Sequence, residues 1–203
     1  MCGRYKQTSP IGTLAEVFGI AEMPGFEAFG VLAPGMKAPV IRGNALSLMT
    51  WGFVPHWSKE DLKTKIINAR LETLSDKPSF RNAKRCIIPA NGFFEWDKSF
   101  KPSRPLDFHL ADDAPFAFAG LCDEWTDKAT GEVRETFAIV TTAAAAPVAS
   151  IHDRMPVILM TTTARAAWNN MEIFTPESVL LLTRTASFPR ERDDAETAQL
   201  ALF

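Results

Sequence analysis

The sequence has few of the residues that build disulfides and metal sites. Its 203 residues include three cysteines and three histidines, all widely spaced. An odd number of scattered cysteines favours free thiols in a reducing compartment over a disulfide framework. No CxxC or HExxH spacing is present, so we expect no metal site and no cofactor.

Long apolar runs and nucleotide-binding motifs are also missing. No apolar run approaches the roughly 18 residues of a membrane span, and the first residues lack the basic and apolar stretches of a secretory signal. We therefore expect a cytoplasmic protein with no membrane partner. There is no Walker loop, GxGxxG or GxSxG pattern, which excludes the commonest nucleotide-binding and serine hydrolase classes.

The charge is weak overall but unevenly distributed. A net charge of −2 and a pI near 6.0 argue against indiscriminate binding of nucleic acid. Between residues 56 and 104, however, eleven basic side chains stand against six acidic ones. This segment could form a basic face, and an ordinary mixed surface is the alternative.

The pattern of apolar residues predicts many strands and few helices. With 46% hydrophobic residues, the chain can bury a sizeable core. Short apolar or alternating segments predict strands at 45–51, 85–90, 93–96, 106–110, 115–121, 136–142 and 155–160. Segments led by serine or threonine predict helices at 9–18, 161–171 and 175–182. In the first of these, Ser9 is the expected cap and Pro10 the first helical residue. We predict one strand-rich α+β domain over 1–203, with mostly antiparallel sheets forming a barrel-like core, a few flanking helices and a loose acidic tail at 190–203.

Cys2 has only Met1 ahead of it. If Met1 is removed, the chain begins with an α-amine and a thiol on adjacent carbons, which is a reactive pair. Gly3 leaves room beside this pair, and Arg4 places a fixed positive charge next to it.

Three further segments carry polar residues that could do chemistry. Asn91-Gly92 predicts a tight turn, which places Glu95 among aromatic residues on the returning strand. Poor solvation there raises the pKa of a carboxyl group and suits a general acid or base, whereas a surface Glu95 is the alternative. His152 could transfer a proton and Arg154 could bind a phosphate, or His152 could be purely structural. The segment 66–74 alternates like a strand with one polar face, which could simply face solvent.

Taken in series, the motifs resemble the SRAP (SOS-response-associated peptidase) family over about residues 2–160. The blocks that carry the resemblance are MCGRY (1–5), WGFVPHW (51–57), NARLET (68–73), RCIIPANGFFEW (85–96), FAFAGLCDEW (116–125), TT (141–142) and IHDRMPVIL (151–159). The resemblance implies a protein that recognises abasic sites in single-stranded DNA and links itself to them covalently through its N-terminal cysteine. The family name records instead an inferred peptidase that removes its own first residues.

The resemblance also implies roles for individual residues. Glu95 would assist sugar-ring opening and imine formation, His152 would protonate or steady the sugar oxygen, and Asn68 would hold the Cys2 backbone. Side chains expected to bind phosphates or line the DNA channel are Arg70, Arg154, Thr141, Arg4 and Arg85. Side chains expected to stack on bases or wedge between them are Trp57, Trp96, Phe80 and Pro34.

The implied chemistry explains why the first residue would be cysteine. An α-amine has a pKa of about 7.7 to 8.0 against about 10.4 for lysine, so far more of it is unprotonated at pH 7. The amine captures the aldehyde of an abasic sugar as an imine, and the neighbouring thiol closes a thiazolidine ring with a large effective-molarity advantage. The expected partner is single-stranded DNA bound by a monomer. Two alternatives remain open: a cysteine peptidase with Cys2 as nucleophile, and a non-covalent single-stranded DNA-binding module.

Overall fold

The computed structural model describes residues 2–20, 28–62 and 64–170. Its strands are β1 (Arg4–Gln7), β2 (Gly30–Leu32), β3 (Lys37–Arg42), β4 (Ala45–Trp51), β5 (Asn68–Arg70), β6 (Lys84–Ala90), β7 (Gly92–Asp97), β8 (Arg104–His109), β9 (Phe116–Thr126), β10 (Val133–Ala143), β11 (Arg154–Pro156) and β12 (Ile158–Leu159). Its helices are α1 (Ile11–Phe18), α2 (Pro78–Arg81) and α3 (Thr162–Asn169), with short 3-10 turns η1 (Leu71–Thr73) and η2 (Val148–Ser150). The strand-rich α+β class is therefore as predicted.

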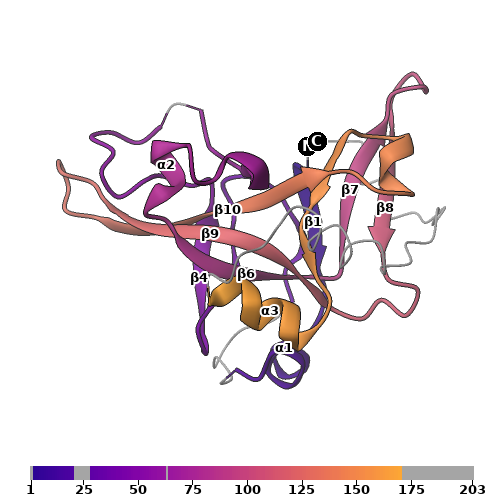
Figure 1. Cartoon of the computed structure of the whole chain (residues 1–203), viewed down its shortest axis with the longest axis horizontal. Coiled ribbons are helices and arrows are strands. Elements are labelled where there is room, and N and C mark those ends of the chain that lie inside the picture. Colours follow the sequence, from indigo (N-terminus) through magenta and orange to yellow (C-terminus); the bar gives the residue numbers. More distant parts are fainter. Residues whose placement is uncertain (1, 21–27, 63, 171–203) are drawn as a thin grey trace.

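Five strands close into a barrel. They follow the order β10-β4-β3-β6-β9, and β9 pairs back onto β10. Most neighbours are antiparallel, while β10 runs parallel to β4 and to β5. β9 and β10 form a long hairpin that crosses the molecule (Figure 1). This closed sheet confirms the predicted barrel-like core.

A second, four-stranded antiparallel sheet has the order β2-β1-β7-β8. The turn predicted at Asn91-Gly92 is wrong, because β6 and β7 belong to different sheets and Asn91 is only the junction between them. The buried Asn91 side chain donates to the hydroxyl of Ser9 at 2.8 Å, so Ser9 does not cap the helix that follows. A Cβ at Gly92 would lie 3.1 Å from the backbone oxygen of Phe108 and 2.7 Å from Cε of Lys6, so a larger residue would fit there only if these neighbours shifted.

The helices follow the local sequence signals only in part. α1 begins one residue later than predicted, with Pro10 as an N-cap that makes no side-chain hydrogen bond. In α3, the Thr161 hydroxyl accepts from the Ala164 N–H at 3.0 Å, which is the predicted type of cap. The predicted helix at 175–182 and the tail at 190–203 lie outside the described residues.

Two buried clusters form the core. One draws side chains from both sheets and includes Cys2, Tyr5 and Phe93. Within it the Tyr5 ring meets Trp51 edge-on, with ring centroids 5.2 Å apart. The other cluster lies beneath α3 and includes Trp168. Cys2 is thus a core residue at the junction of the two sheets, and not a frayed end.

Candidate active site around Cys2

Cys2 is separated from β1 by Gly3 alone and is fully buried. Asn68, at the start of β5, donates from Nδ2 to the Cys2 carbonyl oxygen at 3.0 Å. Because Asn68 is paired with Ile139 of β10, the barrel wall fixes the position of this amide. Burial raises the pKa of the Cys2 thiol far above its usual value, and the negative charge of Glu95 adds to the effect. The thiol at this position is therefore neutral at physiological pH.

Glu95 comes from β7 and is 3% exposed. It follows Phe94, which pairs with Arg4 of β1, so the strand register carries Glu95 toward the segment that holds Cys2. Burial raises the pKa of Glu95, as its aromatic neighbours in the sequence predict, while the positive charges of the amino terminus, His152 and Lys98 lower it. A raised pKa makes a carboxyl group better able to hold a proton and pass it on, which suits a general acid or base.

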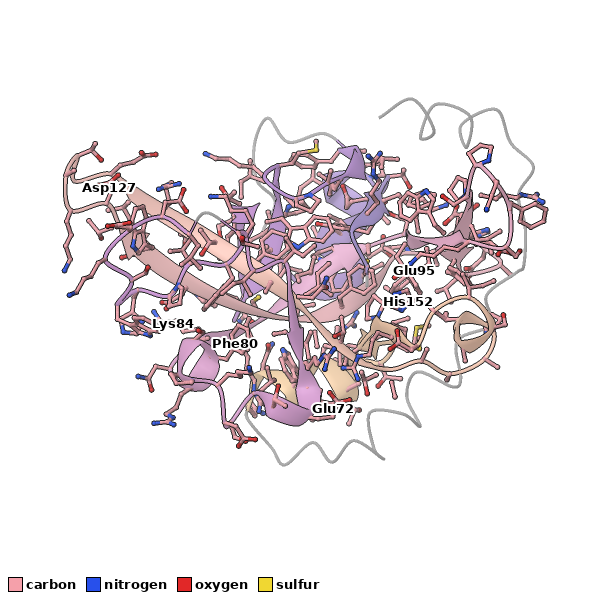
Figure 2. All side chains as sticks on the ribbon, turned by 90° about the horizontal axis from the view of Figure 1, so that it is seen from above. Glu72, Phe80, Lys84, Glu95, Asp127 and His152 are labelled. Atoms are coloured by element: carbon pink, nitrogen blue, oxygen red, sulfur yellow. The ribbon has the colours of Figure 1, made fainter. Side chains whose placement is uncertain are left out.

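His152 lies between η2 and β11, close to Glu95 (Figure 2). Its Nδ1 accepts a hydrogen bond from the backbone N–H of Arg154 at 3.0 Å and lies 2.9 Å from Oδ1 of the exposed Asp153. The positive charge of a protonated His152 lowers the pKa of Glu95.

Three residues predicted to bind phosphate come together at the ends of β5, β10 and β11. Arg70 is paired with Thr141 across β5 and β10, and the Arg154 guanidinium donates to the Thr141 carbonyl oxygen at 2.8 Å. Glu72, which no sequence motif singled out, accepts two hydrogen bonds from Arg154, both 2.8 Å long. The strand predicted from the alternation of segment 66–74 ends at Arg70, and Glu72 lies in the 3-10 turn η1 that follows it. Arg154 holds the pKa of Glu72 below its usual value, so this ion pair neutralises Arg154.

Arg4 and Trp96 lie beside the segment that holds Cys2. Arg4 belongs to β1, and its guanidinium carbon lies 6.0 Å from the centre of the Trp96 ring. This distance is at the outer limit of a cation–π contact. A fixed cation and a partly exposed aromatic face therefore border the position of Cys2.

The sequence profile of the SOS response associated peptidase (SRAP) family matches residues 1–195. The chain belongs to the SRAP family. Curated relatives support this assignment over nearly the whole length. Abasic site processing protein YoqW of Bacillus subtilis is 37% identical over 214 residues, which cover 99% of this chain and 92% of the relative. Abasic site processing protein YedK of Escherichia coli is 33% identical over 186 residues, which cover 85% of this chain and 81% of the relative.

Solved structures show the same fold. A crystal structure of a protein from Bacteroides thetaiotaomicron superposes with a TM-score of 0.81 at 27% identity, covering 95% of this chain and 93% of the other. A phage-related protein from Bordetella bronchiseptica gives a TM-score of 0.68 at 28% identity, covering 95% of each chain.

Other residues expected at the SRAP site are engaged elsewhere or have no contact with it among the described residues. The Arg85 guanidinium stacks 4.4 Å above the Trp168 ring of α3 and donates to the Trp168 carbonyl oxygen at 3.0 Å. Phe80 of α2 packs against Phe53, with ring centroids 5.6 Å apart, and lies well away from Glu95 in Figure 2. Arg85 and Phe80 therefore make packing contacts in which neither Glu95 nor His152 takes part.

Trp57 and Pro34 are both exposed at the surface, and Trp57 is 53% exposed. Neither has a hydrogen bond or ring contact to Glu95 or His152 within the part of the chain that the structure covers. Over that same part, no group of three His, Cys, Asp or Glu side chains could hold a metal ion. None of its helices is long and apolar enough to cross a membrane.

Proposed function

We propose that this protein processes abasic sites in single-stranded DNA by capturing them covalently through Cys2. Two observations support the proposal: the relatives are named abasic site processing proteins, and Asn68 holds the Cys2 backbone beside a buried acid. The second observation carries most weight, because it gives the first residues of the chain a defined position next to a group that can transfer protons. A monomeric state and a cytoplasmic location remain part of the proposal.

The capture needs no oxidant, reductant or cofactor. Removal of Met1 exposes the Cys2 amine, which adds to the C1 aldehyde of the ring-opened deoxyribose. The resulting carbinolamine loses its hydroxyl group as water and becomes an imine. The thiol sulfur then bonds to the imine carbon while the thiol proton passes to the nitrogen, which closes a five-membered thiazolidine ring. One water is released overall.

Glu95 and His152 supply the proton transfers in this scheme. Burial raises the pKa of Glu95 and so favours its protonated form, which can give a proton to the departing hydroxyl group and later recover it. His152 steadies or protonates the sugar oxygen during ring opening. Asn68 has a positioning role, because its hydrogen bond to the Cys2 carbonyl oxygen holds the amine where it can reach the aldehyde.

Phosphates of the DNA strand bind at Arg70, Thr141 and Arg154, with Arg4 and Trp96 on the adjoining surface. Contacts of this kind fix the position of a strand without reading its sequence, as an abasic-site protein requires. Glu72 must share or release Arg154 when a phosphate arrives, because it now occupies both arms of the guanidinium. The Glu72–Arg154 pair therefore weakens binding to DNA that lacks the other contacts.

The raised pKa of Cys2 argues against a thiolate peptidase. Cysteine peptidases use a thiolate, which requires a lowered thiol pKa. Burial has the opposite effect here. In the capture scheme the amine attacks first and the thiol adds within the same molecule, where the imine nitrogen takes the thiol proton.

The test uses chain without Met1 and an oligonucleotide that carries one deglycosylated uracil. We expect a shifted band on a denaturing gel and an intact mass equal to protein plus DNA less one water. Cys2→Ala abolishes the band, whereas Cys122→Ala, the matched control at another buried cysteine, keeps it. Turnover of a peptide without any adduct would favour the peptidase. Salt-sensitive binding that denaturation abolishes would favour the non-covalent module.

A further inference from the structure

A hollow of about 480 Å³ lies beside the β7–β8 hairpin. Its apolar walls are Phe100, Leu106 and Phe108 from the hairpin and Pro147 and Ile151 from the η2 segment, with Arg104 among its polar residues. The volume falls within the range of about 300 to 1,000 Å³ that is typical of small-molecule sites. Neither the SRAP resemblance nor the chemistry of Cys2 accounts for this hollow.

The hollow adjoins the site around Cys2. Glu95 pairs with Leu106, and two residues further along Asp97 pairs with Arg104. Because side chains two residues apart in a strand share a face, the strand residues that line the hollow are on the same face as Glu95. On its other side, Ile151 directly precedes His152. The positive charge of Lys98, in the loop of this hairpin, also lowers the pKa of Glu95.

The loop beside the hollow combines positive charge with an exposed aromatic ring. Lys98, Lys101 and Arg104 stand within seven residues, and Phe100 between them is 51% exposed. The acidic residue at the start of this loop, Asp97, accepts hydrogen bonds from the backbone N–H of Ser99 at 2.9 Å and from its hydroxyl at 2.6 Å. Basic residues around an aromatic ring bind single-stranded nucleic acid, since cations hold the backbone and the ring stacks on a base.

We propose that this hollow receives the nucleobase of a nucleotide next to the abasic site, with Phe100 stacking on the base and Arg104 contacting its edge or the adjoining phosphate. The proposal rests on the proposed function and adds to it a subsite for an intact neighbour. An abasic sugar has no flat apolar face to cover these walls, whereas every base has one. The subsite would make recognition depend on an intact nucleotide beside the lesion as well as on the lesion itself.

The test compares three abasic oligonucleotides: one with all other bases present, one with the 5′ neighbour replaced by tetrahydrofuran, and one with the 3′ neighbour replaced. Tetrahydrofuran lacks both the base and the aldehyde. We expect one of the two replacements to slow cross-linking by wild-type protein about tenfold at sub-saturating DNA. Phe100→Ala should react with the complete oligonucleotide at that slower rate and lose nothing more when the same base is removed.

Val133→Ala is the matched control, because Val133 is 56% exposed and lies in β10 outside the hollow; it should respond to the three oligonucleotides as wild type does. Equal rates of wild type on all three oligonucleotides would overturn the subsite. So would an equal loss by Phe100→Ala on all three. Fluorescence anisotropy of the same oligonucleotides with Cys2→Ala protein measures the subsite without cross-linking. Absence of any adduct with wild type would therefore refute the proposed function while this binding comparison still decides the subsite.

Discussion

Replacing Glu95 by glutamine should make the protein more stable and less active. Glu95 is 3% exposed, and burial raises its pKa. Glutamine has nearly the same shape and carries no charge to desolvate. We therefore expect Glu95→Gln to increase the free energy of unfolding at pH 8, and to slow cross-linking by about 10² to 10⁴-fold through loss of the proton transfer.

The pH dependence follows from the direction of the shift. A carboxyl group with a raised native pKa binds more protons in the folded than in the unfolded state at pH values between its two pKa values. The free energy of unfolding of wild type therefore falls as the pH rises from the unfolded pKa through the raised native one. Every pH unit by which the native pKa exceeds the unfolded one lowers the free energy of unfolding by about 1.4 kcal/mol. This loss is complete above the native pKa. Below about pH 4, where both states are protonated, wild type and variant should be equally stable.

Urea unfolding followed by fluorescence of the five tryptophans at pH 8 and at pH 4 measures this difference. Glu124→Gln, on the exposed side of β9, is the control and should give no gain at either pH. If wild type is the more stable protein at pH 8, or the advantage of the variant grows as the pH falls, the Glu95 carboxylate is stabilised by its partners and the reasoning is refuted.

Two further predictions concern arginines. Glu72→Gln removes the charge that neutralises Arg154, so affinity for single-stranded DNA should rise. The slope of log K against log salt concentration should steepen by about 0.7. An unchanged slope in fluorescence anisotropy titrations would show that Arg154 does not contact the phosphates. Arg85→Ala loses the stacking on Trp168 and should lower the free energy of unfolding by about 1 kcal/mol. Its cross-linking rate should be unaffected, and a slower rate at unchanged stability would assign Arg85 to the DNA channel.

Much of the fold was predictable because local patterns record which face of a segment is buried. The strand predicted at 45–51 has those bounds in the structure, and the strands predicted at 85–90 and 93–96 are each within one residue. Aromatic neighbours alone indicated the raised pKa of Glu95. These features depend on alternation and on adjacent residues, which a sequence displays directly.

The remaining features depend on partners that are distant in the sequence. The Asn91-Gly92 pair has the composition of a hairpin turn, but nothing nearby reveals that the next strand joins another sheet. Arg154 and Glu72 are 82 residues apart in the sequence. Trp168 and Cys86, whose carbonyl oxygen accepts a hydrogen bond from the Trp168 indole, are also 82 residues apart. Long-range pairs of this kind decide which cations are available to a ligand, and composition does not encode them.

The burial of Cys2 also sets an order of events during synthesis. Its hydrogen-bond partner Asn68 lies 66 residues downstream, so the nascent terminus stays accessible until much of the chain has left the ribosome. An aminopeptidase acts on an extended and exposed end, which the growing chain offers before Cys2 is buried. We therefore expect Met1 to be trimmed while the chain is still being synthesised, before Cys2 takes its place in the core.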